Sequence, residues 1–328
     1  MNIFLEPVFS DIYNKYPIIL IDVGASGGLE SNWLPAVKYL QTIGFEPDKR
    51  AHFSLPQNER QKYLNVALGD KNTTLPFYLT KKQQTSSIYK PNYRFLNNFP
   101  DVERFNIVDQ TGLDTDTLDN SLKVNSILRA DFIKLDTQGS ELSILNGGNE
   151  ILSNQIFGIE IEVEFIELYE NQPLFSDVDQ FIRKLGFQLF DIQRAYWKRK
   201  SGNINYGKKG QLVFGQVLYL KKSDYLKKTV ENLNGSDLKK SKVLNAISIC
   251  LLYGYVDYAY DIFINNNIFS TDESDQIIKT LKKKTSIGNY IPNIKGKGIL
   301  AKLFYYLGDI FSSNNNHWSM TDRKLGNK

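Results

Sequence analysis

The chain of 328 residues is longer than the common size of one compact core, so its length predicts one large domain with a smaller attachment. Hydrophobic residues make up 41% and charged residues 23% of the chain, a balance that excludes general disorder. The single cysteine excludes an intramolecular disulfide and a cysteine-based zinc site, and two histidines leave little for a histidine-rich metal site.

The first predicted unit is a strand, a glycine turn, a helix and a second strand. Ile18 to Val23 is an apolar run interrupted only by Asp22, as expected for a parallel strand that is buried on both faces. Apolar residues then recur at helical spacing from Trp33 to Leu40, and residues 42–46 predict the next strand.

The alternation of strands and helices continues along the chain. Asp48 can cap a second helix, whereas residues 81–112 show no regular pattern. Helices are expected at residues 141–145 and 179–185, and strands at residues 63–68, 75–80 (an accessory strand), 131–136, 156–165, 187–192 and 211–220. This order predicts a doubly wound α/β sheet.

The composition shifts to Lys, Asn and Ser from Lys221 onward, around four predicted helices at residues 243–252, 256–264, 274–281 and 299–311. We therefore predict a domain over residues 1–222 and a separate basic helical region over residues 223–328. From Tyr225 the chain carries about 15 basic and 9 acidic residues, which exceeds the whole net charge of +4, so the residues before Tyr225 are mildly acidic. The sequence shows neither a basic leader nor a run of about 20 apolar residues, so a cytoplasmic protein is expected.

The turn after the first strand has the composition of a nucleotide-binding turn, because glycine lets the backbone pass close to a ligand. Gly24 and Gly28 stand four residues apart, a spacing that disfavours a dinucleotide, and no Lys-Ser/Thr follows as in an ATP-type phosphate loop. Glu46 ends the next strand about 20 residues later, where a carboxylate can accept hydrogen bonds from both ribose hydroxyls. Together these features predict an adenosyl ligand at the carboxyl edge of the sheet.

The sequence resembles the FkbM family of class I methyltransferases over roughly residues 18–222. The resemblance rests on segments in a fixed order, namely residues 21–28 (IDVGASGG), 44–47 (GFEP), 65–70 (NVALGD), 86–87 (SS), 117–119 (TLD), 132–142 (FIKLDTQGSEL), 162–165 (EVEF), 168–177 (LYENQPLFSD) and 210–219 (GQLVFGQVLY). It implies a seven-stranded sheet with one antiparallel strand near its end, S-adenosylmethionine as cofactor, and O-methylation of a sugar or natural-product hydroxyl.

The resemblance also implies roles for individual residues. The cofactor loop corresponds to Asp22, Gly24, Ala25 and Gly28, the ribose acid to Glu46, an adenine-side contact to Asp70, and the position beside the reacting methyl to Asp136. Two positions depart from the family pattern. Ser26 replaces the usual asparagine but keeps a short hydrogen-bonding group, and Gln216, where aspartate is common, cannot act as a base.

Methyl transfer to a hydroxyl requires in-line alignment of the reacting atoms and removal of a proton, for which one carboxylate is sufficient. Asp136 is the first candidate for this base, since it ends an apolar strand at the expected ligand-binding edge; a capping role in the turn is the alternative. Glu162 lies between Glu160 and Glu164 on one face of its strand. That triplet predicts a general base or, with Asp136, a site for a divalent cation such as Mg²⁺; an exposed or helix-covered face is the alternative.

Substrate contacts are expected from two segments. Tyr169 and Gln172 provide an aromatic and polar rim suited to a sugar ring, and Ser86 and Ser87 lie in an irregular segment of the kind that often covers a site. Ordinary packing and turn roles are the alternatives.

Two further classes of function compete with a small-molecule or glycan methyltransferase. The basic tail could supply phosphate contacts for an RNA methyltransferase, although the segment Asp136-Thr-Gln-Gly139 differs from the Asn-Pro-Pro-aromatic motif of amino-directed enzymes, so nucleic acid is disfavoured. A non-catalytic adenosyl-binding module is the other class. The tail is a candidate for docking to a membrane surface or a protein, and residues 297–307 are expected to pack within the tail or to lie on a membrane interface. The sequence gives no signal for an oligomeric state.

Overall fold

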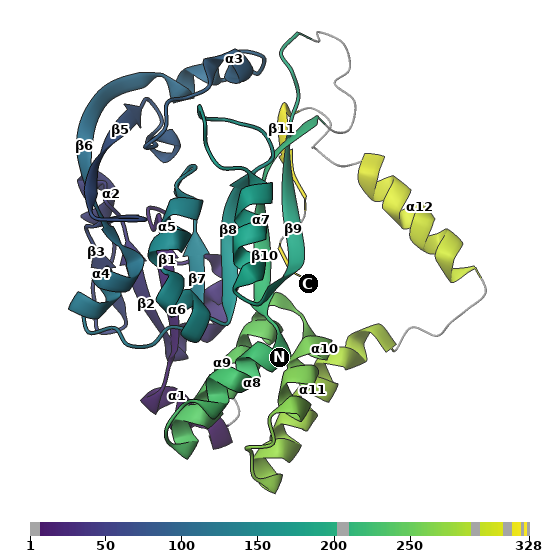
Figure 1. Ribbon diagram of the computed structural model, residues 1–328. Helices are drawn as coiled ribbons and strands as arrows, with labels where there is room; N and C mark the ends of the chain where they lie inside the picture. Colours follow the sequence, from purple (N-terminus) through teal and green to yellow (C-terminus); the bar gives the residue numbers. More distant parts are fainter. Residues whose placement is uncertain (1–6, 202–209, 290–295, 311–316, 323–324, 327–328) are drawn as a thin grey trace.

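The computed structural model describes residues 7–201, 210–289, 296–310, 317–322 and 325–326, and its centre is a mixed sheet in the order β11-β9-β10-β8-β7-β1-β2-β3 (Figure 1). Its strands are β1 (Ile18–Val23), β2 (Leu40–Phe45), β3 (Gln61–Leu64), β7 (Phe132–Leu135), β8 (Gly158–Glu164), β9 (Phe187–Trp197), β10 (Gln211–Lys221) and β11 (Ser319–Thr321). The predicted doubly wound α/β class is confirmed.

Among the described residues the sheet has eight strands and not the expected seven, whereas the expected antiparallel strand near its end is present as β10. Pairing is parallel from β3 to β8, and β10 is antiparallel to both β8 and β9. The eighth strand, β11, adds antiparallel to β9 with Met320 opposite Tyr196. Three residues carry no detectable period-two pattern, so this edge strand could not be read from the sequence.

The central strands separate two hydrophobic cores. In β1, Ile18 and Leu20 belong to one core, whereas Ile19 and Ile21 belong to the other. All six residues of β1 are buried, which confirms the prediction of a strand covered on both faces. Alternation along a pleated strand is the reason that one apolar run serves both layers.

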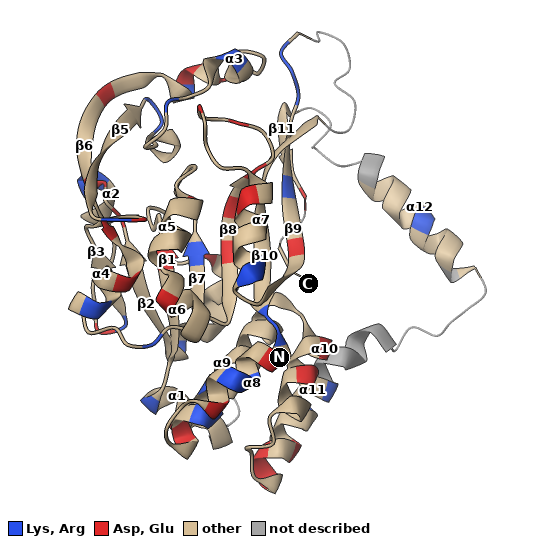
Figure 2. Ribbon diagram, viewed as in Figure 1, with Lys and Arg blue, Asp and Glu red and all other residues tan. Residues whose placement is uncertain are grey.

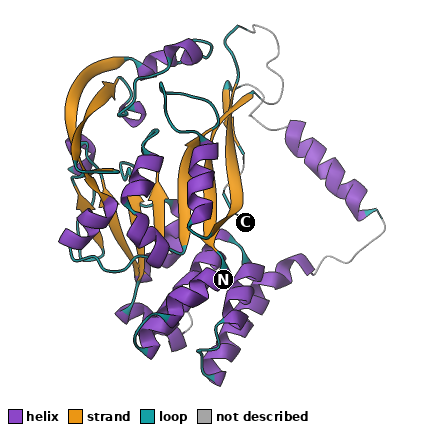
Figure 3. Cartoon of the chain, in the orientation of Figure 1, coloured by secondary structure: helices purple, strands orange, loops and turns teal. Residues whose placement is uncertain are grey.

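One layer of helices covers the face that carries Ile19 and Ile21 (Figure 3). It consists of α4 (Leu118–Val124), α5 (Glu141–Gly147), α6 (Asn149–Asn154) and α7 (Phe175–Lys184). The other face is covered by η3 (Ser31–Tyr39), α1 (Ser10–Lys15), α8 (Ser223–Glu231), α9 (Ser236–Tyr253), α10 (Val256–Asn265) and α11 (Thr271–Asn289). Short elements complete the chain: η2 (Pro7–Phe9), α2 (Lys49–His52), η4 (Gln83–Thr85), α3 (Tyr93–Leu96) and η5 (Val102–Phe105).

The helix after the glycine turn differs from its prediction. It is a 3-10 helix with Pro35 inside it, and it buries Trp33 and Ala36, whereas Leu34 and Val37 are exposed. The prediction assumed the 3.6-residue period of an α-helix. A 3-10 helix repeats every three residues, so its buried face carries Trp33 and Ala36, and Leu34 and Val37 lie outside that face.

A second, three-stranded sheet stands beside the main one in the order β4-β6-β5, formed by β4 (Ala67–Gly69), β5 (Thr73–Thr80) and β6 (Ile107–Thr117). It corrects two expectations. Residues 63–68 are divided between β3 of the main sheet and β4 of the small one, and residues 81–112 end in a long strand. β6 escaped detection because most of its side chains are exposed and polar.

The C-terminal helices do not form the separate region that was predicted. Residues of α8 to α11 share one buried cluster with β1, β7 and β10, so they are a layer of the same core. Cys250 on α9 is fully buried in this cluster, as its apolar surroundings indicated. Only α12 (Lys297–Ile310) stands apart from the layer in Figure 1. In the described part of the chain, no helix is long and apolar enough to cross a membrane.

Candidate functional site

The glycine turn brings β1 against the end of β7. Gly24 has a φ of +83°, and a Cβ atom there would lie 2.0 Å from the carbonyl oxygen of Asp136. Its N–H donates to the carbonyl of Phe45 at 3.0 Å, which ties the turn to the end of β2 as well. Only glycine allows this approach, so the turn fixes the relative positions of three strand ends.

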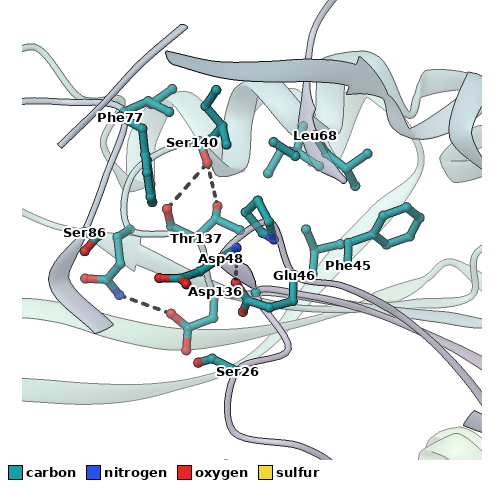
Figure 4. Close-up of a pocket in the computed structure, with 18 of the residues that line it drawn as sticks. Ser26, Phe45, Glu46, Asp48, Leu68, Phe77, Ser86, Asp136, Thr137 and Ser140 are labelled. Carbon is teal, nitrogen blue, oxygen red and sulfur yellow. Dashed lines mark hydrogen bonds between the residues drawn. The ribbon is translucent and has the colours of Figure 1, made fainter. Parts of the chain in front are cut away.

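A cavity lies above these strand ends (Figure 4). Its floor comes from the carboxyl ends of β1, β2, β7 and β8, and its remaining walls come from the small sheet and the segment after β5. The residues that line it include Gly24, Ser26, Glu46, Asp48, Leu68, Phe77, Ser86, Leu113, Thr115, Asp136, Thr137, Gln138, Ser140 and Glu162. Open α/β sheets bind ligands at this edge.

Glu46 reaches the cavity from the end of β2. Its side chain is buried, and its Oε1 accepts a hydrogen bond from the N–H of Asp48 at 2.8 Å. Burial raises the pKa of Glu46 to about 7, and the Asp48 N–H acts in the opposite direction. Asp48 also caps α2 by accepting from the N–H of Arg50, as the sequence indicated. No described residue donates to Glu46 Oε2, so this oxygen is available to a ligand.

Asp136 and Glu162 are joined by one amide group. Gln138 Nε2 donates to Glu162 Oε1 at 2.7 Å and to Asp136 Oδ1 at 3.2 Å, while Gln216 Nε2 donates to Glu162 Oε2 at 3.3 Å. Gln138 has a φ of +59°, a costly conformation for a residue other than glycine, and such strain concentrates at functional sites. The bridge holds two carboxylates beside each other at the cavity.

Burial governs the charge of the glutamates on β8. Burial and the neighbouring Asp136, Glu164 and Glu141 carboxylates raise the pKa of Glu162 well above its ordinary value. Burial raises the pKa of Glu160 to about 7, against a hydrogen bond from Tyr253 of α9. The three glutamates share one face, since Ile159, Ile161 and Val163 pack on the other. All three are buried, so the alternative of an exposed face is wrong.

The predicted substrate residues divide into one that lines the cavity and three that lie behind its wall. Ser86 lines the cavity and its Oγ accepts from the N–H of Thr80. Ser87 Oγ donates to the carbonyl of Gln138 at 2.7 Å, and Gln172 Oε1 accepts from the N–H of Tyr169 at 2.6 Å.

Tyr169 requires a correction, because it is fully buried and its ring cannot stack on a sugar. Its hydroxyl lies 3.1 Å from Gln138 Oε1 and 3.0 Å from the carbonyl of Thr85, so it can donate to either. The contact with Gln138 orients that amide, whose NH₂ group then faces the two carboxylates.

The comparisons with known proteins now decide the family. A family model described as the methyltransferase FkbM domain matches residues 22–189, more than half of the chain. The chain belongs to the FkbM methyltransferase family. It is an S-adenosylmethionine-dependent methyltransferase.

Individual relatives of the FkbM domain are distant. The chain is 26% identical to the 2-O-methyltransferase NoeI of Sinorhizobium fredii over 174 residues, which cover 49% of this chain and 70% of that protein. A crystal structure of methyltransferase FkbM from Methylobacillus flagellatus shares 15% identity, with a TM-score of 0.33, over 62% of this chain and 43% of that one. Magnesium protoporphyrin IX methyltransferase from Synechocystis shares 8% identity, with a TM-score of 0.31, over 66% and 76% of the chains.

Four further predicted cofactor residues of the FkbM domain do not line the cavity: three lie in or beneath the glycine turn, and Asp70 follows β4. Asp22 is buried beneath it, with Lys134 Nζ 3.9 Å from its Oδ1. Burial raises the pKa of Asp22 to about 6, and Lys134 acts against that rise. Ala25 is buried, and Gly28 completes the turn with a φ of +69°. Asp70 is exposed and does not line the cavity; its N–H donates to Ser143 Oγ.

Sequence reasoning did not identify a role for Gln138 or Lys134, or the cavity wall formed by Phe77 and Leu113. Gln138 stood inside a recognised motif, and its position between two acids was the only available signal. As for the predicted Mg²⁺ site, the described residues contain no group of three or more His, Cys, Asp or Glu side chains that could hold a metal ion.

Proposed function

We propose that this FkbM domain transfers the methyl group of S-adenosylmethionine to a hydroxyl group of a sugar, glycan or natural-product acceptor. The observation that carries the proposal is the pair of carboxylates, Asp136 and Glu162, joined by Gln138 at the cavity. Their position at the carboxyl edge suits removal of a proton from an acceptor hydroxyl. The relative in Sinorhizobium fredii is named as a 2-O-methyltransferase, which supports oxygen as the atom methylated.

The residues around the turn fit the adenosyl part of the cofactor. Glu46 has one oxygen held by the Asp48 N–H and a second oxygen that no described residue contacts, so the carboxylate can accept hydrogen bonds from ribose hydroxyls. Ser26 lines the same cavity with a short polar group, and the apolar Leu68 and Phe77 provide walls against which an adenine ring can pack. S-adenosylmethionine, when bound, supplies an electrophilic methyl group on a sulfonium centre.

Asp136 is the residue that we assign as the base. One of its oxygens accepts from Gln138, and no described residue donates to Oδ2, which can take the proton as the acceptor oxygen attacks the methyl carbon. Both oxygens of Glu162 already accept hydrogen bonds from amides. We therefore assign Glu162 to positioning, since it holds Gln138 and, through it, Asp136.

The substrate residues follow the same division. Ser86 lines the cavity and can contact the acceptor directly. The other three residues do not reach the acceptor and instead hold Gln138 in place. Ser87 and Tyr169 contact Gln138 directly, and Gln172 accepts a hydrogen bond from the backbone of Tyr169.

The test is transfer of labelled methyl groups from S-adenosylmethionine. The purified full chain is incubated with glycan, lipid-linked sugar, small-metabolite and RNA fractions, and each fraction is analysed for label. The expected result is label in a carbohydrate or natural-product fraction, identified as an O-methyl ether and formed about a hundredfold or more slowly by Asp136→Asn. Label confined to RNA would overturn the proposal and favour the alternative use of the basic tail.

A further inference from the structure

Helix α12 exposes apolar side chains that have no place in the core. It has 14 residues and, at about 1.5 Å per residue, a length of about 21 Å. All of the large apolar side chains described in it are exposed, from 40% for Leu307 to 77% for Tyr305; the full set is Ile299, Leu300, Leu303, Phe304, Tyr305, Tyr306 and Leu307. Monomeric proteins rarely expose so continuous an apolar surface without a binding role.

Five of the seven exposed apolar residues form one stripe along the helix. Ile299, Leu303 and Leu307 recur every four residues, and Leu300 and Phe304 lie beside them at the same interval. Residues spaced by four lie on one face of an α-helix, so these five side chains present a single apolar face. Ala301, Lys302 and Tyr305 lie off this face. The expectation that this segment packs within the tail is therefore wrong for the described residues, because the stripe is open to solvent.

The charges around the stripe indicate what covers it. Residues 276–308 contain seven lysines and neither Asp nor Glu, and the sequence of α12 itself contains two lysines and one acid, Asp309. Lys302, within the helix, is exposed, and Figure 2 shows the described part of α12 as otherwise uncharged. A lysine-rich segment with an apolar helix is complementary to an anionic lipid surface, since the lipid headgroups attract the lysines and the acyl boundary takes the apolar face.

We propose that α12 docks the enzyme on an anionic membrane surface, with its apolar stripe in the headgroup region and its lysines on the lipid phosphates. The helix lies along the surface, as its length and its exposed Lys302 are those of an interfacial helix and not of a spanning one. A nucleic acid would satisfy the lysines but would leave the stripe of leucine and phenylalanine side chains in water, which makes it the weaker occupant. The proposal is independent of the methyl acceptor.

The test is co-sedimentation of the full chain with vesicles at low salt. We expect binding to vesicles of equal parts phosphatidylcholine and phosphatidylglycerol, weaker binding to phosphatidylcholine alone, and release as the salt concentration rises. Leu303→Asp with Phe304→Asp should reduce the bound fraction by about tenfold or more, because two apolar anchors are lost. Lys302→Glu should weaken binding by about fivefold or more.

The matched control is Leu128→Asp, at a site outside α12 where the side chain is also exposed, at 76%, and it should bind vesicles as the unchanged chain does. Because the α12 stripe lies outside the core, all variants should retain the melting temperature and the affinity for S-adenosylmethionine. The proposal would be overturned if the folded chain did not bind anionic vesicles, or if the double variant bound them as well as the unchanged chain does. It would also be overturned if the only effect of the double substitution were to turn a dimer into a monomer. Binding to RNA but not to vesicles would overturn it in favour of a nucleic acid.

Discussion

The two ends of β7 each carry a buried or half-buried aspartate, and the two residues are held in opposite ways. Asp131, before the strand, accepts from the Ile19 N–H at 3.0 Å, from Lys242 Nζ at 2.8 Å and from Asn245 Nδ2 at 3.1 Å. Asp136, after the strand, accepts from the Gln138 side chain at 3.2 Å and faces the cavity. One end is saturated with protein donors and the other keeps an oxygen for a ligand.

Because of this difference, Asp131 at one end of β7 contributes to stability, whereas Asp136 at the other end is available for chemistry. A buried carboxylate whose partners all come from the protein holds elements together, here β1, β7 and α9. A carboxylate with unused acceptor capacity beside a cavity is costly for the empty protein but available to a substrate.

The largest effect is expected from Asp136→Asn. The amide keeps the shape of the side chain but cannot take a proton, so kcat should fall by about 10²–10⁴-fold. The melting temperature should change little, since one hydrogen bond from Gln138 is involved. Kinetics on the identified acceptor and a thermal melt check the two halves. Full activity in the variant would show that Asp136 is not the base.

A comparable effect, in stability and not in chemistry, is expected from Asp131→Ala. The change leaves Lys242 buried without its carboxylate, a situation that costs about 3–5 kcal/mol in the free energy of unfolding. Chemical denaturation measures this loss, and the affinity for S-adenosylmethionine should be unchanged. The control is Asp131→Asn combined with Lys242→Met, which removes both charges while the amide oxygen can still accept from the Ile19 N–H, and it should recover most of the stability. If folded Asp131→Ala bound S-adenosylmethionine more weakly than the unchanged chain, the assignment of Asp131 to stability alone would be wrong.

The same strand shows what sequence can and cannot predict. Asp136 was identifiable because it follows an apolar run and precedes a turn, which are local features. Asp131 stands beside the same run, but its partner Lys242 is 111 residues away and lay in a segment that was expected to be separate. The assignments of Glu46 and Asp136 to one edge needed only strand order, whereas the burial of Tyr169 depends on packing between distant segments.

Glu46→Ala should give the third effect, on cofactor binding alone. Loss of hydrogen bonds from ribose hydroxyls to a charged acceptor costs about 1.5–3 kcal/mol each. Calorimetry should show this weakening while Glu46→Gln retains part of the affinity. Because the pKa of Glu46 is raised to about 7 and the ionised form is the better acceptor, affinity in the unchanged chain should rise as the pH rises through 7. If the affinity for S-adenosylmethionine changed neither with Glu46→Ala nor with pH, Glu46 would not be a cofactor-binding residue.

The smallest effect concerns Glu160, which shares a face with Glu162 but contacts Tyr253 in the helical layer instead of the cavity. Burial raises the folded-state pKa of Glu160 to about 7, so the folded protein binds more protons than the unfolded chain between pH 5 and 7. The stabilising contribution is therefore complete below the ordinary pKa and is lost as the pH rises through about 7. Glu160→Gln mimics the neutral form, and its stability relative to the unchanged chain should improve by about 1–2 kcal/mol between pH 5.5 and 8. Denaturant titrations of both proteins at the two pH values measure this difference. A difference of the opposite sign would mean that the charged form of Glu160 is stabilised by Lys134, and that this acid belongs with Asp131 among the paired groups that hold the fold.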